Sequence, residues 1–385
     1  MNYFSSDFKL GILGGGQLGK MLLFETRKFD IQTYVLDPSN EAPSRMACNQ
    51  FYKGDLMDFE TVYQFGKMVD VLTIEIELVN LDALEKLESE GIKIYPSRST
   101  LKAIQNKGKQ KDFYVENNIP TSKHLRFVDL NELKKAVTSS EVEMPFVWKC
   151  AEFGYDGNGV KIVRSTFDLI DLPDVECIAE DMVPFKNELA VIVCRNPSGE
   201  IKTYPVVEME FHPEANQVEY VICPARIDDK VAEKARAIAL NVSEKFNHVG
   251  LLAVEMFQTE DDEILVNEVA PRPHNSGHYS IEASYTSQFE NHIRAVLNLP
   301  LGNTDSKVAG IMVNLVGEDG FSGNVIYENI ETILGWNGVT PHIYGKKQTR
   351  PFRKMGHVTI VNQDIKEARR IAEDVKNTIR VISGQ

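Results

Sequence analysis

Two glutamates carry the clearest chemical signal in the sequence. Glu255 and Glu268 each lie in a short apolar run, and the polar residues 259–263 between the runs are typical of a hairpin turn. If the turn centres between Asp261 and Asp262, the two carboxylates face each other on one side of the sheet. Facing like charges destabilise a sheet unless a cation or a shared proton lies between them. Mg²⁺ fits such a pair and leaves coordination positions for nucleotide phosphates. A slipped register that puts one glutamate in solvent is the alternative.

A glycine-rich loop beside a lysine indicates a phosphate site. Gly154, Gly157 and Gly159 follow an apolar strand that contains Lys149, and a second strand begins at Val160. The backbone N–H groups of such a loop bind phosphate oxygens, and the lysine adds a positive charge. A flexible hairpin with an exposed lysine is the alternative. The facing glutamates favour the phosphate interpretation, because both features belong to a magnesium nucleotide site.

A second glycine-rich turn lies near the start of the chain. Residues 14–19 match G-x-G-x-x-G, follow the first predicted strand and open a helix, which is the setting in which a helix N-terminus binds an anion. Asp37 ends the next strand, where a dinucleotide enzyme holds a ribose. By itself this turn favours a nicotinamide or flavin enzyme. A tight turn required only for helix and sheet packing is the alternative.

The run that follows Glu268 presents several hydrogen-bond donors on a stiff backbone. Pro271 and Pro273 restrict the chain, while Arg272, His274 and Asn275 offer donors that suit a phosphorylated or carboxylated small molecule. A zinc site formed by the two histidines of the run, at 274 and 278, would need a helix that its proline and glycine residues disfavour. Anion binding is therefore preferred.

A basic stretch stands out near the C-terminal end. Residues 332–363 contain no Asp or Glu, and the cations of this stretch are Lys346, Lys347, Arg350, Arg353 and Lys354. A basic patch on an acidic protein concentrates a small anionic substrate. A solvated surface turn is the alternative, since most charge runs have that role.

The composition excludes several classes of protein. The formal net charge of −14 argues against a general nucleic-acid or anionic-membrane binder. Five widely spaced cysteines, an odd number, suggest neither a disulfide framework nor a zinc site, and reduced cysteines in the cytoplasm are expected. No targeting segment is recognisable, and no apolar run approaches the ~20 residues of a membrane span. A soluble cytoplasmic protein with small-molecule partners is therefore expected.

The elements that must position these residues fall into three regions. Residues 9–95 alternate short apolar runs with amphipathic helices, which predicts βαβ units on a parallel sheet. Residues 99–118 are predicted to be helical, and the region to about 300 is rich in strands, one of them over 203–207, with one long helix over 228–246. Two or three short strands and a helix over 364–379 are expected after residue 308. The fold class is thus α/β and α+β.

Taken together, these motifs resemble those of a known family. The similarity rests on the 14–19 turn, Lys149 with the loop after it, Glu255, the Asn267 to His278 run, and the basic segment 350–357. These motifs resemble 5-(carboxyamino)imidazole ribonucleotide synthases of the ATP-grasp superfamily, and the resemblance covers nearly the whole chain. It implies a Rossmann-like N-terminal domain over 1–104, a two-lobed ATP-grasp domain over 105–305, and a small β-rich C-terminal domain over 306–385. A homodimer is also implied.

The resemblance implies a reaction and its participants. ATP, bicarbonate and 5-aminoimidazole ribonucleotide would give 5-(carboxyamino)imidazole ribonucleotide, ADP and phosphate through carboxyphosphate, a step of purine biosynthesis. Mg²⁺ would be bound by Glu255 and Glu268. The implied catalytic residues are Asp156, Arg272, His274 and Lys347. The implied ATP-binding residues are Lys107, Lys149, Gly154, Tyr155, Asp156, Gly157, Asn158, Gly159, Val160, Glu180, Asp181, Met182, Val183, Glu188, His212, Asn267 and Glu268. The implied ribonucleotide-binding and bicarbonate-binding residues are Gly15, Gly16, Gln17, Leu18, Glu75, Tyr155, Arg272, His274, Asn275, Lys347, Arg350, Arg353 and Lys354.

The sequence departs from the family pattern in the phosphate loop. Asn158 lies where the family usually has Arg or Lys, and Phe153 replaces a usual glycine. Another ATP-grasp carboxylase, or a formate-dependent glycinamide ribonucleotide transformylase, is the alternative function. A dinucleotide oxidoreductase and a catalytically silent nucleotide-binding regulator are more distant alternatives. Because the chain ends at Gln385, a fused mutase domain is not expected, and the carbamate would pass to a separate protein.

Overall fold

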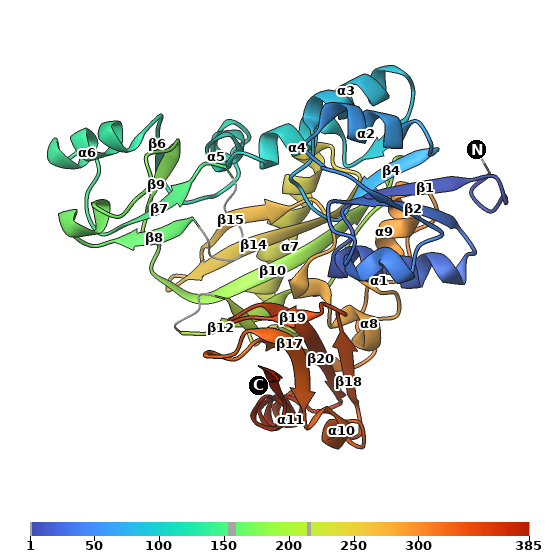
Figure 1. Ribbon diagram of the computed structural model, residues 1–385. Helices are drawn as coiled ribbons and strands as arrows, with labels where there is room; N and C mark the ends of the chain where they lie inside the picture. The colour runs from blue at the N-terminus through green and yellow to red at the C-terminus, as the bar shows by residue number, and fades with distance from the viewer. Residues whose placement is uncertain (1, 153–158, 214–216, 385) are drawn as a thin grey trace.

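The computed structural model describes residues 2–152, 159–213 and 217–384. Its N-terminal part is a five-stranded parallel sheet of order β3-β2-β1-β4-β5, covered by helices, which confirms the predicted βαβ units (Figure 1). The elements of this part are β1 (Lys9–Leu13), α1 (Gln17–Lys28), β2 (Gln32–Asp37), β3 (Gln50–Lys53), α2 (Phe59–Gly66), β4 (Val71–Ile74), α3 (Leu81–Ser89) and β5 (Lys93–Tyr95). Strand β3 was not among the predicted elements.

Two helices lead into a small four-stranded lobe. The predicted helical stretch 99–118 divides into α4 (Arg98–Ile104) and α5 (Lys107–Glu116), because Asn106 caps the second helix by accepting the backbone N–H of Lys109. The lobe has the strand order β6-β9-β7-β8. Its elements are β6 (His124–Phe127), α6 (Leu130–Thr138), β7 (Phe146–Cys150), β8 (Val160–Val163) and β9 (Cys177–Asp181).

A nine-stranded sheet forms the centre of the molecule, in the order β15-β14-β10-β12-β13-β16-β20-β18 with β11 beside β10. Its first part contains β10 (Phe185–Arg195), β11 (Ile201–Thr203), β12 (Val207–Phe211), β13 (Val218–Cys223), α7 (Asp229–Phe246), β14 (Gly250–Thr259) and β15 (Ile264–Ala270). The predicted strand over 203–207 was wrong. That segment separates β11 from β12, where Pro205 cannot donate to a sheet ladder.

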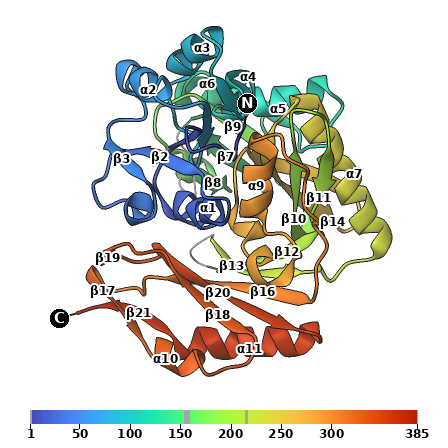
Figure 2. The same cartoon turned by 90° about the vertical axis from the view of Figure 1, so that its right-hand side faces the viewer.

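The last part of the chain continues this sheet and also builds a small three-stranded sheet of order β19-β17-β21. Strands β16, β20 and β18 extend the nine-stranded sheet across the proposed boundary at residue 305, and α11 packs beneath them (Figure 2). The elements are α8 (Ser280–Ala283), α9 (Gln288–Val296), β16 (Ala309–Val316), β17 (Gly323–Glu328), α10 (Ile330–Ile333), β18 (Val339–Ile343), β19 (Gln348–Thr349), β20 (Lys354–Asn362), α11 (Ile365–Thr378) and β21 (Arg380–Ser383). The prediction of two or three short strands was therefore too low.

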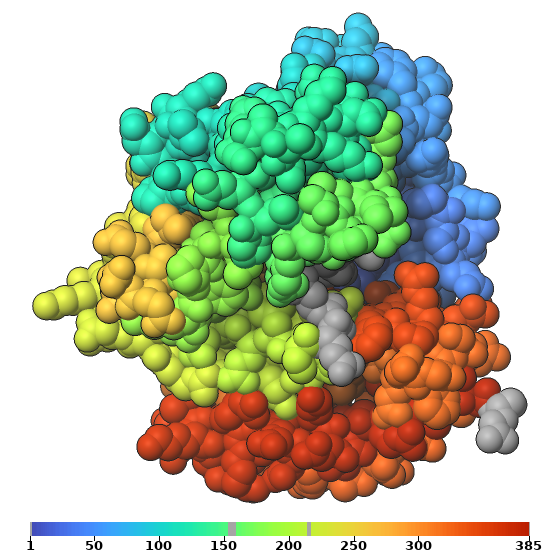
Figure 3. All heavy atoms as spheres, turned by 90° about the vertical axis from the view of Figure 1, so that its left-hand side faces the viewer, coloured from blue at the N-terminus to red at the C-terminus, as the bar shows by residue number. Residues whose placement is uncertain are grey.

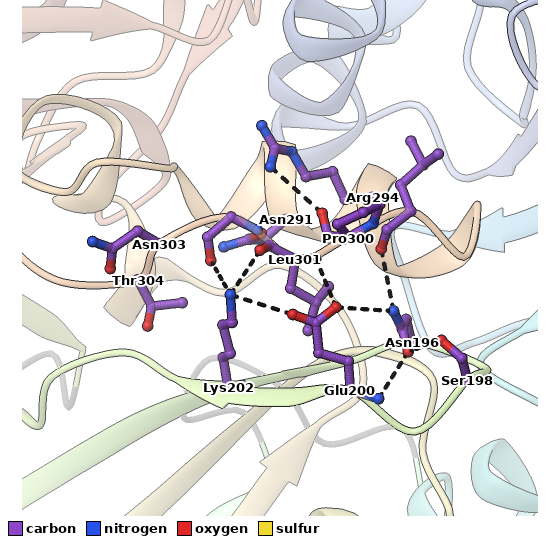
Figure 4. Close-up of polar contacts among 12 residues, drawn as sticks. Asn196, Ser198, Glu200, Lys202, Asn291, Arg294, Pro300, Leu301, Asn303 and Thr304 are labelled. Atoms are coloured by element: carbon purple, nitrogen blue, oxygen red, sulfur yellow. Dashed lines mark hydrogen bonds and ion pairs between the residues drawn. The ribbon is translucent and has the colours of Figure 1, made fainter.

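Polar contacts anchor the connection that leads into these last strands (Figure 4). Lys202 donates to the carbonyl of Leu301 at 2.7 Å, and the backbone N–H of Leu301 donates to Glu200 at 3.0 Å. Asn196 donates to the carbonyl of Leu299 at 3.2 Å. The β10–β11 hairpin thus binds the segment after α9 and fixes where the C-terminal strands begin.

Helix α7 covers one face of the central sheet, whereas α8 and α9 cover only part of the other. Helix α7 covers β10, β14 and β15 with a core that includes Val254, Met256, Val266 and Val269. Residues between these positions point to the opposite side. That side lies between the four-stranded lobe and the C-terminal strands, which Figure 3 shows at the top and the bottom of one face. Among the described residues, no helix is long and apolar enough to cross a membrane.

Candidate active site

The glycine-rich turn at residues 14–19 binds two carboxylates of the chain itself. The N–H of Gly15 donates to Asp37 at 2.8 Å, and the N–H of Gly19 donates to Glu75 at 3.0 Å. A Cβ on Gly16 would lie 2.7 Å from a carboxylate oxygen of Glu75, so glycine is required for this approach. Asp37 is therefore committed to the turn instead of being free for a ribose. This disfavours the dinucleotide interpretation.

The two glutamates face each other as predicted, with the help of a bulge. Glu255 on β14 pairs with Glu268 on β15, but Met256 pairs with Val266, so Asn267 is the additional residue. A regular ladder through Met256 and Val266 would instead place Glu255 opposite Asn267. Val266 and Val269 both enter the core beneath the sheet, which leaves Asn267 and Glu268 together on the other side. The bulge thus gathers three polar side chains on one face.

The electrostatics of this pair suit a cation. Burial and the neighbouring charge of Glu268 raise the pKa of Glu255 well above its usual range. Burial opposes ionisation of Glu268 as well, but Lys107 and Lys149 hold its pKa low, and Lys107 forms an ion pair with it. No cluster of three or more His, Cys, Asp or Glu side chains that would bind a metal occurs among the described residues. The carboxylates of Glu255 and Glu268 are hard oxygen donors, the kind that Mg²⁺ prefers.

Two buried lysines, Lys111 and Lys149, lie near the glutamate pair, beside the partly buried Lys107. Glu180 on β9 binds Lys149 and Lys111, each at 3.0 Å, and accepts a hydrogen bond from Ser122 at 2.8 Å. Burial opposes its ionisation, but the two lysines lower the pKa of Glu180 to about 2. Lys149 also donates to Asn267 at 2.9 Å. The Glu180 side chain therefore holds the two lysines in place by ion pairs. Its neighbours Asp181 and Met182 are exposed at the end of the strand.

The structure describes only some of the other residues that were predicted to bind the nucleotide. The β7–β8 hairpin is confirmed, with the backbone N–H of Cys150 donating to the carbonyl of Gly159 at 2.8 Å, and Val160 opens β8. Gly154, Tyr155, Asp156, Gly157 and Asn158, together with Phe153, lie outside the described residues. Val183 follows β9. Glu188 lies on β10, and burial raises its pKa to about 7.

His212 lies away from the glutamate pair. It lines a second cavity of about 160 Å³ on the C-terminal side, where its ring lies 5.9 Å from that of Phe352. Gln217 and Val218 line both this cavity and the larger one that contains the glutamates, so the two cavities adjoin. The structure therefore does not bring His212 into the wall of the larger cavity.

The polar side chains after Glu268 are held by acidic or amide partners. Arg272 binds Glu77 at 2.8 Å, and His274 lies 3.2 Å from Glu255. Asn275 exchanges two hydrogen bonds of 2.9 Å with Asn314 on β16. These contacts place the run in the same wall as the glutamate pair.

The basic stretch divides between the cavity and the surface. Lys354 lines the large cavity. Lys347 is exposed and binds Glu41 at 2.6 Å, Arg350 is exposed, and Arg353 donates to the carbonyl of Gln348 at 2.5 Å. Only one of the four cations predicted to bind substrate therefore reaches the cavity wall in this structure.

All three parts of the chain meet at this cavity of about 400 Å³. Its wall includes Gln17, Leu18 and Glu75 from the N-terminal part, Lys107, Glu255, Glu268, Arg272, His274 and Asn275 from the middle part, and Lys354 from the C-terminal part. Three residues that were not predicted as site residues also belong here. His278 and Glu77 line the cavity, and Lys111 binds Glu180 beside it. Lys111 lies one helical turn after Lys107, a spacing that signals a shared helix face.

Comparisons with known proteins agree with this division. Residues 8–105 match the model of the ribonucleotide synthetase preATP-grasp domain, and residues 112–289 match the ATP-grasp domain. Residues 310–371 match the phosphoribosylaminoimidazole carboxylase C-terminal domain. The matched segments span all three parts of the chain that line the cavity.

Individual relatives are similar over almost their full length. The N5-carboxyaminoimidazole ribonucleotide synthase of Bacillus subtilis is 38% identical over 359 residues, covering 92% of this chain and 91% of that protein. The crystal structure of the synthetase from Thermotoga maritima has a TM-score of 0.89 and 42% identity, with 98% and 100% of the two chains covered. The Aspergillus clavatus synthase, solved with ADP and 5-aminoimidazole ribonucleotide, has a TM-score of 0.88 and 34% identity over 97% and 98% of the chains.

Proposed function

The chain belongs to the N5-carboxyaminoimidazole ribonucleotide synthase family of ATP-grasp ligases, and on this premise we propose how the large cavity performs the reaction. The product is the 5-(carboxyamino)imidazole ribonucleotide named above. The enzyme is an ATP-dependent ligase of purine biosynthesis that carboxylates 5-aminoimidazole ribonucleotide. Bicarbonate is the proposed carbon source, and carboxyphosphate is the proposed intermediate.

The glutamate end of the cavity is proposed to bind the ATP phosphates. Glu255 and Glu268 would hold Mg²⁺, which when bound neutralises phosphate charge and orients the γ-phosphoryl group. Lys107 is paired with Glu268 in this structure. With Glu268 engaged by the ion, the Lys107 ammonium would be able to bind the phosphates. Lys149, held by Glu180 and Asn267, would bind them from a fixed position. The loop at 154–158 and residues 180–183, with Glu188 and His212, remain proposed ATP contacts.

The cationic end is proposed to bind the carbon source and the ribonucleotide. A bicarbonate oxygen would attack the γ-phosphorus, and the ADP oxygen would leave, forming carboxyphosphate. The exocyclic amine of the ribonucleotide would then attack the carboxyl carbon, phosphate would leave, and the proton lost by the amine would pass to the departing phosphate. Arg272, His274 and Lys354 would stabilise the negative charge that develops on these oxygens in a closed site. The turn 15–18 with Glu75, and Asn275, would position the ribonucleotide, and Asp156, Lys347, Arg350 and Arg353 remain proposed contacts.

The observation that supports this proposal most strongly is the facing glutamate pair, with lysines beside it and cations across one cavity. Phosphate release from MgATP tests it. Release should require both bicarbonate and 5-aminoimidazole ribonucleotide, and Glu268→Gln should abolish it. Equal turnover with glycinamide ribonucleotide and formate would support the transformylase alternative and overturn the proposal. A silent regulator would release no phosphate with any purine intermediate.

Further proposals concern the state of the protein. We propose the domain boundaries 1–104, 105–305 and 306–385, a homodimer, and a cytoplasmic location without nucleic-acid or membrane partners. The net charge of −14 and five free cysteines support the last point. Sedimentation equilibrium tests the dimer.

A further inference from the structure

The hydrogen bonds of Gln288 fix the orientation of its own amide group. Gln288 begins α9, and its side chain is fully buried. Its Oε1 accepts the backbone N–H of His274 at 3.0 Å, and its Nε2 donates to the backbone carbonyl of His274 at 2.7 Å. A backbone N–H can only donate and a carbonyl can only accept. The two ends of the amide are therefore identified by their partners.

The same amide determines the tautomer of His278. Gln288 Nε2 also lies 3.0 Å from His278 Nδ1. Because Nε2 of an amide only donates, Nδ1 must accept, and the proton of a neutral ring must lie on His278 Nε2. Burial, together with the charges of His274, His342, Lys354 and Arg272, lowers the pKa of His278 well below its usual value. The ring is therefore a neutral Nε2–H donor.

The free edge of this ring reaches the large cavity. The His278 ring is held between Phe289 and His357, at centroid distances of 5.6 and 4.7 Å, and it lines the cavity. Within the described residues, no group accepts a hydrogen bond from Nε2, and Nε2 is not among the polar atoms sealed from solvent without a partner. Arg272, His274 and Lys354 line the same cavity. A neutral donor there adds a hydrogen bond without adding a further charge to a cationic cluster.

We propose that His278 is a further substrate-binding residue, whose Nε2–H donates to an anionic oxygen held at the cationic end of the cavity. Gln288 is the positioning residue that fixes the tautomer of His278. The inference rests on the proposed function, which supplies two sources of such an oxygen. One is the phosphate of the ribonucleotide, and the other is bicarbonate or the group formed from it.

The kinetic test uses His278→Phe, which retains the ring contacts and removes the donor. A hydrogen bond to a charged group predicts a rise of about 10- to 100-fold in the KM for bicarbonate or for the ribonucleotide. Each substrate is varied while the other is saturating, and the arm that responds identifies the source. The KM for MgATP should change by less than twofold. His342→Phe is the matched control, since His342 stacks on the far side of His357 and is absent from the cavity wall.

Nitrogen-15 NMR of the imidazoles provides the readout that a structural role would not change. The wild type should show His278 protonated at Nε2 and unprotonated at Nδ1. Gln288→Glu, which offers Nδ1 an acceptor, should move the proton to Nδ1 and raise the same KM as His278→Phe. A proton on Nδ1 in the wild type, or unchanged KM values for both anionic substrates in a folded His278→Phe enzyme, would overturn the proposal. Failure of the wild type to use the ribonucleotide would instead overturn the proposed function, whatever the tautomer.

Discussion

Removal of one carboxylate should stabilise the metal-free enzyme at neutral and alkaline pH. Burial next to Glu268 raises the pKa of Glu255 to about 8, whereas the unfolded chain releases this proton near 4.5. Between these values the folded state keeps a proton that the unfolded state has lost, so stability falls as pH rises. The slope is about 1.4 kcal/mol per pH unit, or about 2 kcal/mol between pH 6.5 and 8.0. Glu255→Gln removes this loss.

Urea denaturation in EDTA at several pH values between 6.5 and 8.0 measures the effect. The unfolding free energy of the wild type should fall across this range by about 2 kcal/mol more than that of Glu255→Gln. Glu260→Gln is the matched control, because Glu260 is exposed at the turn of the same hairpin. Its curve should parallel that of the wild type. If the unfolding free energies of the wild type and Glu255→Gln changed equally with pH, this would refute the argument that ionisation of Glu255 beside Glu268 destabilises the folded state.

Two other outcomes follow from burial and position. Burial lowers the pKa of His248 to about 4 and that of His292 to about 3, so below pH 6.5 the unfolded chain binds protons that the folded rings do not bind. The unfolding free energy, measured by urea denaturation, should therefore fall by about 2 kcal/mol for each ring between pH 6.5 and 5.0. An unfolding free energy that does not change over this range would contradict the prediction. Lys354→Met should lower kcat/KM for the ribonucleotide or bicarbonate at least tenfold, because Lys354 lines the cavity. Lys347→Met, measured in parallel under saturating MgATP, should have a smaller effect, because Lys347 is exposed and paired with Glu41. An equal effect of the two variants would contradict the placement of these lysines.

The sequence predicted the site where the chemistry is local to one hairpin or one turn. The apolar runs around Glu255 and Glu268, together with the polar turn, predicted the hairpin and the facing pair, but the turn centres on Asp261 and the bulge restores the pairing. The bulge at Asn267 was not predictable in this way, because it depends on Val266 and Val269 both packing beneath α7. The glycine turn was also recognised, but its partner Glu75 comes from another strand, and spacing alone does not reveal that contact.

Contacts between distant segments account for what the sequence did not predict. Lys111 acquires its role only when Glu180, from a different strand, is placed beside it. His278 was noted as a possible zinc ligand and as part of the family run, but no role was assigned to it, because its tautomer depends on Gln288 at the start of α9. The basic stretch looked uniform in the sequence, yet folding directs Lys354 to the cavity and leaves Lys347 beside Glu41 at the surface.

The most direct test of the account is a crystal grown with ADP and Mn²⁺ in place of Mg²⁺. Anomalous scattering should place an ion between the two hairpin strands, coordinated by a carboxylate oxygen from each glutamate and by a phosphate oxygen, with Lys107 moved from Glu268 to the nucleotide. An ion that contacts neither carboxylate, or a nucleotide bound elsewhere in the molecule, would contradict the account.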